Sequence, residues 1–533
     1  MANLEDLVTR PWIHAAALLL AGCWGEPELT GGDPQRPDIV LISVDTLRAD
    51  HLASYGHTRQ TSPFFDRLAS QGARYSFARS ASPWTLPAHT TLLTGQLPLT
   101  HKVVDDNLRL PETVPVLPAV MQTQGYATGG FVGTMYVSRM FGFDRGFDRF
   151  EDFDIHTEKA NLKGGTVAED VVDAALKWWS DVPEGQPAFL FLHVYDVHYE
   201  YDPPGDYATL FDRAPQKGDP KYRNYFHFKR KKNRLTEAEF EHQRAQYDES
   251  IRYVDDQFAR LEAAAKAAGR DVRWVITSDH GEEFGERGTW GHAHTLFAEQ
   301  LHVPLILSGP GVPAGVVVDA PVGNHDVAPT LAAWAGAPAD ALQPDGVALT
   351  PGQDQTVALA SRPFPAETTR FKTNRLGLYE GGLRLEWDLK SGETWLYDPH
   401  ADPKEATDLS DARPDDVKRL QDRLEVLHGL PWEATAPGRV ESAGVLLRQG
   451  RRGVLMVSPG DRFTALPFDA DVRFQPSTGP TQGPWKANGG ERPADGAGLV
   501  YRGAGGGAAG EMSREECEAL VAMGYMQDCA GLE

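Results

Sequence analysis

The chain contains several short, nearly continuous runs of apolar and β-branched residues. The first is PDIVLISV at residues 37–44, and similar runs are AFLFLHV at 188–194, VRWVIT at 272–277 and VPLILS at 303–308. Continuous runs of this length are typical of parallel strands that helices cover on both faces. Helical patterns lie between them, most clearly at residues 250–267, where apolar residues recur three and four apart before Gly269. The alternation predicts an α/β fold with a mostly parallel sheet.

Composition limits the classes of partner. The 533 residues are 41% hydrophobic and 24% charged, which is typical of a globular protein with a sizeable core. The 52 Lys and Arg residues against 75 Asp and Glu residues give a net charge of −23. An acidic surface repels the phosphate backbone, so we expect no nucleic-acid partner.

The N-terminus predicts export. Residues 12–23 read WIHAAALLLAGC, an apolar run that is too short to span a bilayer but suits a secretory signal. Its end, from Leu20 to Cys23, resembles the lipobox of bacterial lipoproteins, in which the cysteine carries the lipid. We therefore predict a lipoprotein-type signal peptide at 1–23, a tether at 24–36 and a lipid anchor in the periplasm or outer membrane. A plain secretory signal and a hydrophobic N-terminal helix are the alternatives.

The pattern changes after residue 337. Shorter alternating stretches and a helical segment predict a smaller α+β subdomain at 338–435, after a catalytic domain at 37–337. Residues 436–533 are interpreted as a C-terminal extension with a terminal helix and a Gly- and Pro-rich insertion at 476–511, which we expect to be flexible. Cys517 and Cys529 are an even pair in a chain predicted to be exported, which favours a disulfide between them.

Carboxylates and imidazoles recur where the predicted strands end. A single such residue is most often a helix cap or a surface group, but clusters at several strand ends are expected to converge at one edge of the sheet. Carboxylate oxygens and neutral imidazoles suit Mg²⁺, Mn²⁺ or Zn²⁺ without any thiol. The clusters are Asp45; His193, Asp196 and His198; Asp279 and His280; and His292 and His294.

Thr85 lies in the segment SPWTLPAHTTLLTG, directly before a helical run. A hydroxyl at a helix N-terminus faces backbone N–H groups and the positive end of the helix dipole, which together stabilise an alkoxide and bind an anionic ester. An ordinary N-cap threonine is the alternative interpretation.

Several segments in this order resemble the sulfatase family of the alkaline phosphatase superfamily. The resemblance covers about residues 37–410 and implies a large mixed sheet between helices, a smaller C-terminal sheet and a divalent metal site. The segments are residues 37–95, FLHVYDVHYEYDPP, YDESIRYVDDQFARL, TSDHGEEFGERGTWGHAHTLFAEQLHVPLI, HDVAPTLAAWAG and WLYDPHADPKEATDL.

The resemblance also implies roles for single residues. Asp45, Asp279 and His280 match metal ligands, and His198 matches a histidine that contacts the ester oxygens. Either His292 or His294 occupies the place of a lysine in many sulfatases, and His294 is preferred. Thr46 stands where many members have a second aspartate, so the ligand set suits Mn²⁺ or Zn²⁺ better than Ca²⁺, while Mg²⁺ also stays possible.

The nucleophile position departs from the family pattern. Formylglycine sulfatases carry Cys-x-Pro-x-Arg, whereas this chain has threonine at 85 and His89 in place of the arginine. Thr85 resembles the threonine nucleophile of phosphorus-transferring members of the superfamily. The sequence therefore predicts hydrolysis of an anionic phosphate or sulfate ester, with phosphorus esters preferred and with cationic His89, His198 and His294 contacting the ester oxygens. The alternative is an inactive member that binds anionic glycans or protein partners.

Overall fold

The computed structural model describes residues 28–429 except 34, 154–166, 200, 213–236, 354 and 371–372, together with short segments between 432 and 521. The predicted signal peptide at 1–23 and Cys529 lie outside the described residues. Within the described part, no helix has the length and hydropathy needed to cross a membrane. Residues 28–33 of the predicted tether already contact the main domain, because the Thr30 hydroxyl donates to the Val182 carbonyl at 2.5 Å.

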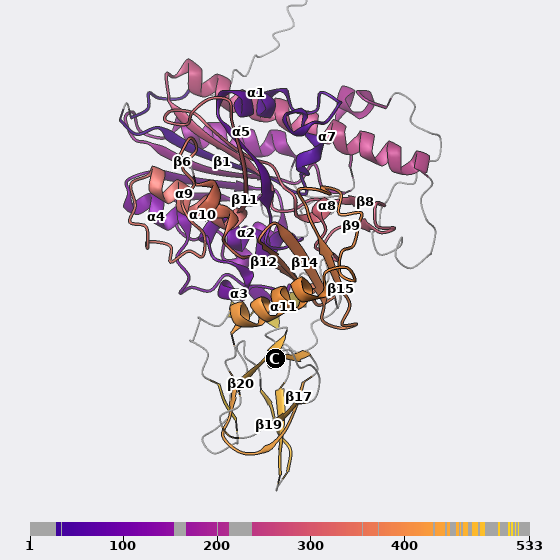
Figure 1. Cartoon of the computed structure of the whole chain (residues 1–533). Helices are drawn as coiled ribbons and strands as arrows, with labels where there is room; N and C mark the ends of the chain where they lie inside the picture. The colour runs from indigo at the N-terminus through magenta and orange to yellow at the C-terminus, as the bar shows by residue number, and fades with distance from the viewer. Residues whose placement is uncertain are drawn as a thin grey trace, which may run out of the picture.

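An eight-stranded mixed sheet forms the centre of the molecule (Figure 1). In spatial order the strands are β11 (Val316–Gly323), β2 (Ala73–Arg79), β10 (Leu305–Ser308), β7 (Val272–Thr277), β1 (Asp38–Val44), β6 (Ala188–Val194), β4 (Ala127–Val132) and β5 (Arg149–Glu151). Strands β5, β4, β6, β1 and β7 run parallel, and β11 runs parallel to β2. This arrangement confirms the predicted mostly parallel sheet.

Strand β10 departs from the expected direction. It forms within the predicted run at 303–308, but it pairs antiparallel with both β7 and β2. Its four residues are all buried, as in a parallel strand covered on both faces. The continuous apolar run therefore reflects burial on two faces and does not determine strand direction.

The helices cover the two faces of the sheet as separate layers (Figure 1). On one side lie α1 (Pro63–Gln71), α5 (Ala168–Ser180) and α7 (Glu237–Ala267), the last of which contains the predicted helix at 250–267. On the other side lie α2 (Thr85–Thr94), α4 (Leu117–Thr123) and α9 (Val327–Trp334).

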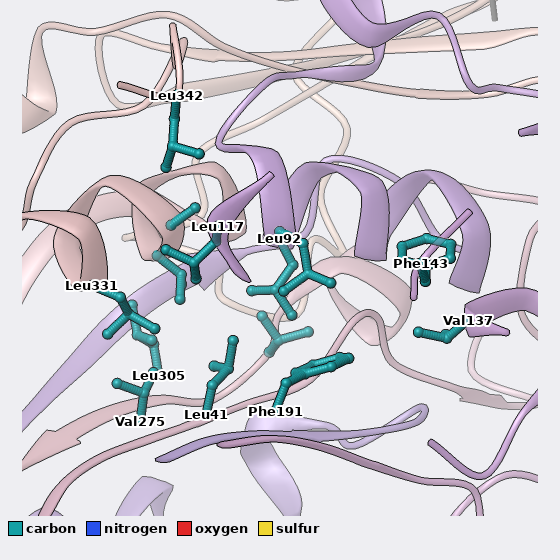
Figure 2. Packing of buried hydrophobic residues seen from close by; sticks show 14 of the residues in the cluster. Leu41, Leu92, Leu117, Val137, Phe143, Phe191, Val275, Leu305, Leu331 and Leu342 are labelled. Atoms are coloured by element: carbon teal, nitrogen blue, oxygen red, sulfur yellow. The ribbon is translucent and has the colours of Figure 1, made fainter. Parts of the chain in front are cut away.

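Alternate residues of each strand supply the two cores. Leu41 of β1 packs into the core beneath α2, α4 and α9, together with Phe191 and Val275 from the neighbouring strands (Figure 2). Val40 and Ile42 pack into the core on the opposite face. Each fully buried aliphatic side chain of this kind contributes about 1.5–3 kcal/mol of transfer free energy, so β1 is held from both sides.

The predicted α+β subdomain is present after the main domain. Four antiparallel strands, β12 (Phe364–Thr368), β13 (Arg375–Glu380), β14 (Leu383–Asp388) and β15 (Thr394–Tyr397), pack against α11 (Pro414–His428). Beyond α11, two further four-stranded sheets contain β16 (Trp432–Ala434), β17 (Gly438–Ser442), β18 (Val445–Leu447), β19 (Leu455–Val457), β20 (Arg462–Leu466), β21 (Val472–Pro476), β22 (Gln482–Trp485) and β23 (Leu499–Tyr501).

Parts of the insertion at 476–511 form strands, contrary to the expectation of a flexible segment. Strand β22 pairs with β21, β23 pairs with β16, and β24 (Gly510–Glu511) pairs with β3 (Leu108–Arg109) in the main domain. Backbone hydrogen bonds to neighbouring strands order these pieces, so they need no apolar core of their own. Cys517 is disulfide-bonded, and its predicted partner Cys529 lies outside the described residues.

Short elements make up the rest of the regular structure in the described residues. They are α3 (Pro98–His101), β8 (Glu283–Phe284), β9 (Trp290–Gly291), α8 (Ala298–Leu301) and α10 (Thr356–Ala360), with 3-10 turns at Ala49–His51, Ala53–Tyr55, Met135–Val137, Arg139–Phe141, Gly205–Thr209 and Asn324–Asp326.

Candidate active site

The carboxyl ends of three adjacent strands bring the predicted residues together. Strand β1 lies between β6 and β7, and its Ser43 pairs in register with His193 on one side and Thr277 on the other. Asp45 follows β1 by one residue and Asp279 follows β7 by two. The parallel topology therefore places Asp45, His193 and Asp279 side by side, as the sequence predicts for strand ends.

The turn after β1 holds Asp45 in place. Thr46 has a φ of 57°, in the left-handed region that β-branched residues rarely adopt. Hydrogen bonds fix this conformation, because the Tyr247 hydroxyl donates to the Thr46 carbonyl at 2.7 Å and the Thr46 hydroxyl donates to the Val197 carbonyl at 2.9 Å. The Thr46 side chain is thus already engaged away from Asp45, whereas its N–H donates to Asp279 Oδ1 at 3.2 Å.

The two aspartates present buried oxygens without hydrogen-bond partners. Among the described residues, both oxygens of Asp45 and the Oδ2 atom of Asp279 lack a hydrogen-bond partner. Both side chains are fully buried. His280 Nδ1 lies 3.0 Å from the Gly281 carbonyl, to which it donates, so Nε2 carries the lone pair. His280 Nε2 lies 3.3 Å from Asp279 Oδ2 and 3.8 Å from Asp45 Oδ1.

These atoms satisfy the requirements of a divalent cation site. One ligand atom from each of Asp45, Asp279 and His280 lies within 4.8 Å of the other two. Burying carboxylates without partners is costly, and a bound cation removes that cost. Burial raises the pKa of Asp45 to about 7, with His280 opposing the shift and Glu282 adding to it. The residues present therefore fit the metal site that the sequence predicts.

Thr85 begins α2 directly beside this group. Trp84 enters the helix in an extended conformation, and every residue from Thr85 to Thr94 is buried. Gly95 ends the helix at a φ of 73°, where an added Cβ would lie 2.8 Å from Pro344 Cβ. The Thr85 hydroxyl oxygen lies 3.4 Å from His280 Nε2. The hydroxyl is therefore within reach of the candidate metal ligands and of the helix N-terminus.

His89 lies beneath the nucleophile position, one turn further along α2. Its Nδ1 donates to the Thr85 carbonyl at 3.0 Å, and its Nε2 accepts from the Ser43 hydroxyl at 3.0 Å. Nδ1 also lies 3.5 Å from Asp279 Oδ2. With both ring nitrogens engaged, His89 fixes the start of α2 against β1, and these contacts leave no free donor for an ester oxygen.

His198 and His292 form a second histidine layer. Their ring centroids lie 4.9 Å apart, and the His292 ring lies 4.5 Å from that of His280. The His198 ring packs against Tyr195 at 4.1 Å and Tyr199 at 4.3 Å. His292 Nδ1 lies 2.9 Å from Glu282 Oε1, which leaves Nε2 as the ring atom available to a ligand.

His294 does not join this layer. Its Nε2 lies 3.1 Å from Glu283 Oε2 and 2.9 Å from the Thr289 hydroxyl, and its Nδ1 donates to the His292 carbonyl at 2.8 Å. The contacts thus favour His292 for the role that the sequence prediction preferred to give to His294.

The expectation that His89 and His198 are cationic also needs correction. Burial lowers the pKa of His89 to about 3, and burial followed by the charge of His292 holds the pKa of His198 well below its ordinary value. Burial, followed by His280 and Arg370, does the same for His292. Burial and the neighbouring positive groups favour the neutral form of these three imidazoles. Positive charge at the site must therefore come from other groups.

Two further residues lie in or beside the site. His193 belongs to a predicted strand-end cluster but has no predicted role of its own, and its Nε2 lies 3.4 Å from Asp45 Oδ2. Arg370, two residues beyond β12, packs its guanidinium over the Trp84 and Tyr136 rings at 4.6 and 4.8 Å and lowers the pKa of His198 and His292. It comes from the C-terminal subdomain, so no local motif pointed to it.

The fold and the site define an α/β ester hydrolase, with a candidate metal centre at the strand ends and a hydroxyl at the N-terminus of a buried helix. The sulfatase family model matches residues 37–337, more than half of the chain. The chain therefore belongs to the sulfatase family of the alkaline phosphatase superfamily and is a sulfatase-like ester hydrolase.

Curated relatives and solved structures agree with this assignment. The choline-sulfatase of Rhizobium meliloti (strain 1021) is 26% identical over 441 residues, covering 70% of this chain and 83% of that protein. A sulfatase of Formosa agariphila is 23% identical, covering 74% of this chain and 87% of its own. The phosphonate monoester hydrolase of Silicibacter pomeroyi superimposes with a TM-score of 0.60 at 21% identity, covering 73% of this chain and 94% of that one.

Cation binding is predicted to stabilise the protein through Asp45. After chelation, adding Mn²⁺ should raise the Tm of the wild type, and Asp45→Asn should lose this response. Because binding needs the carboxylate and the pKa of Asp45 lies at about 7, the stabilisation should grow as the pH rises from about 5 to about 8. Scanning calorimetry with and without Mn²⁺ measures the effect.

Without a cation, the contribution of Asp45 to stability should change with pH in the opposite direction. Native Asp45 keeps its proton between about pH 4 and about pH 7, where the unfolded chain has lost it, so its contribution to stability falls over that window by at most about 4 kcal/mol. Cation-free Asp45→Asn should therefore be more stable than cation-free wild type near pH 8. The exposed Asp181→Asn variant is the control, and a cation response that survives Asp45→Asn would contradict the assignment.

Variants of His292 and His294 should differ in their effects on activity and on stability. His292→Ala should lower kcat/KM by about 10²-fold or more, as expected for a group that contacts the reacting ester. His294→Ala should lower kcat/KM less but reduce the Tm more, because it leaves Glu283 buried without its imidazole partner. Kinetics on an aryl ester and calorimetry on both variants measure these effects. A larger loss of kcat/KM in His294→Ala than in His292→Ala would contradict the placement of His292 in the site.

Proposed function

We propose that the protein is an extracytoplasmic, metal-dependent hydrolase that cleaves an anionic ester through Thr85, with phosphorus esters preferred over sulfate esters. The observation that carries the proposal is the position of the Thr85 hydroxyl. It starts a fully buried helix and lies 3.4 Å from His280 Nε2, next to two aspartates whose free oxygens have no hydrogen-bond partner in the described structure.

Asp45, Asp279 and His280 would hold the divalent cation. Two carboxylates and one imidazole, without the second aspartate that Thr46 replaces, favour Mn²⁺ or Zn²⁺, and Mg²⁺ or Ca²⁺ are the other candidates. When bound, the cation supplies positive charge that stabilises negative charge on the reacting oxygens.

The chain's own residues bind and orient the ester. Because Thr85 is the first residue of α2, its oxygen lies at the positive end of the helix dipole, which favours the developing alkoxide. His89 holds the first turn of α2 through the Thr85 carbonyl, so the hydroxyl keeps its direction. Arg370 supplies a permanent positive charge near His198 and His292, and an anionic ester bound there raises the pKa of both rings toward the protonated, donating form.

The chemistry of the covalent intermediate favours phosphorus. The Thr85 hydroxyl gives up its proton as its oxygen forms a bond to phosphorus, and the bond to the leaving alcohol or phenol breaks as that oxygen takes up a proton. Water then attacks the phosphorus, and a proton from that water returns to the released Thr85 oxygen. A sulfated formylglycine instead releases sulfate by collapsing to its aldehyde, and threonine has no carbon-centred route of this kind. A sulfated threonine would have to be cleaved by water at sulfur.

Sulfate esters are the second candidate substrates. The relation to choline-sulfatase favours them, because that relative covers most of both chains. The phosphorus preference rests on Thr85 itself, so a direct comparison of matched substrates separates the two.

The prediction is that kcat/KM for an aryl phosphodiester or aryl phosphate exceeds that for the matched aryl sulfate. Thr85→Ala should lower the favoured kcat/KM by about 10³-fold or more, since the nucleophile is lost. Thr85→Ser keeps a hydroxyl and should stay within about tenfold of the wild type. Dominant sulfatase activity, or an alanine variant that keeps its rate, would contradict the mechanism.

An inactive protein that binds anionic glycans is the alternative from another class. It gives no reason for a buried hydroxyl, three carboxylate oxygens without hydrogen bonds and a histidine ring nitrogen to converge. The same substrate panel excludes it as soon as Thr85-dependent turnover is seen.

Export and lipid anchoring belong to the proposal through Cys23. Wild-type protein made in a bacterial host should partition into the detergent phase and incorporate labelled palmitate, whereas Cys23→Ser should do neither. Wild-type protein found only in the aqueous phase would refute the anchor.

A further inference from the structure

A pocket lies at the β11 edge of the main sheet, next to the C-terminal subdomain. It opens where β2 and β11 meet the turn between β13 and β14 and the loop at 399–400, and the space between its lining residues, open solvent included, is about 450 Å³. None of its lining residues belongs to the active-site set described above. The pocket is therefore a separate feature, and the proposed hydrolysis does not use it.

Aromatic rings from three strands and one loop contribute to its wall. Phe77 of β2 contacts the His400 ring at a centroid distance of 4.2 Å, and Phe364 of β12 lies 5.9 Å from the Tyr379 ring. Leu383, Ala360 and two prolines add to the apolar lining. A wall of this kind accepts the apolar body of a small molecule.

Arg79 is a buried cation at this pocket. It is only 3% exposed, and among the described residues its side chain has no ion pair and no hydrogen bond. Its guanidinium carbon lies 5.4 Å from the Tyr379 ring centroid, and the buried Tyr379 hydroxyl also has no hydrogen-bond partner there. Buried charges in proteins are normally paired, so this arginine calls for an anion that the chain does not supply.

The other charged groups of the lining are already paired. Arg362 binds both oxygens of Asp326 at 2.8 Å, and Glu380 binds Arg419 and Arg423 at 3.2 and 3.1 Å. Leaving His400 aside, Arg79 is therefore the charged side chain without an oppositely charged partner among the described lining residues. The positive charge of Arg79 also acts on its neighbour His302: burial lowers the pKa of His302 most, and the charge of Arg79 lowers it further.

We propose that this pocket binds a small organic carboxylate. Arg79 and the Tyr379 hydroxyl receive the carboxylate, and Phe77 and Phe364 contact the apolar body. The planar guanidinium matches two carboxylate oxygens at once, which distinguishes this ligand from an apolar neutral molecule.

The test uses the whole protein and benzoate as the probe, with benzamide as the neutral match. Titration calorimetry should show benzoate binding and no benzamide binding. Arg79→Met should weaken benzoate binding by about tenfold or more, and Tyr379→Phe should weaken it less. Arg74→Gln, on the same strand but packed over the Tyr55 ring, is the matched control and should leave binding unchanged.

A steric variant covers the case in which Arg79→Met fails to fold. Ala360 is an exposed lining residue at the end of α10, so Ala360→Phe should fill the pocket and abolish benzoate binding without touching the core. Benzoate binding must also persist in Thr85→Ala and must not compete with an ester substrate. Absence of binding, equal binding of benzamide, insensitivity to the Arg79 and Ala360 variants, or competition at the active site would each overturn the proposal.

Discussion

The architecture of the site depends on keeping two carboxylates buried without hydrogen-bond partners on their free oxygens. Asp45 and Asp279 have no exposed surface, and the described chain leaves three of their four oxygens without a hydrogen bond. This arrangement is costly in the free protein, and only a rigid frame can hold it. Strands β1 and β7 provide that frame, because each is packed between two apolar cores.

The same constraint explains why histidines surround the aspartates. His193, His280 and His89 bring nitrogen atoms to within about 3.5 Å of these carboxylates without bringing permanent charge. Burial lowers the pKa of His193 to about 4 and of His89 to about 3. The neutral rings of His193 and His89 leave the carboxylates available to a cation, whereas a lysine or arginine in their place would neutralise them. The permanent charge of Arg370 is instead located near His198 and His292, where an anionic ester would need it.

Much of this frame could be predicted because the ends of buried strands can be recognised from the sequence. Asp45 and Asp279 follow long apolar runs, and the parallel topology then forces them together. The direction of β10 could not be predicted, since two-sided burial gives the same apolar run in either direction. The choice between His292 and His294 depends on Glu282 and Glu283, which are adjacent in sequence but bind different histidines. Arg370 comes from a distant segment, and only tertiary packing reveals it.

The central claim is that Thr85 forms the covalent intermediate, and mapping that intermediate tests it most directly. The protein would be mixed with an aryl phosphodiester or aryl phosphate, quenched in acid within the first turnover, digested and examined by mass spectrometry. The account predicts a phosphoryl group on Thr85 whose amount matches a burst of released phenol and which is absent from Thr85→Ala. A burst with the group on another residue, or turnover with no adduct on the peptide that contains Thr85, would contradict it.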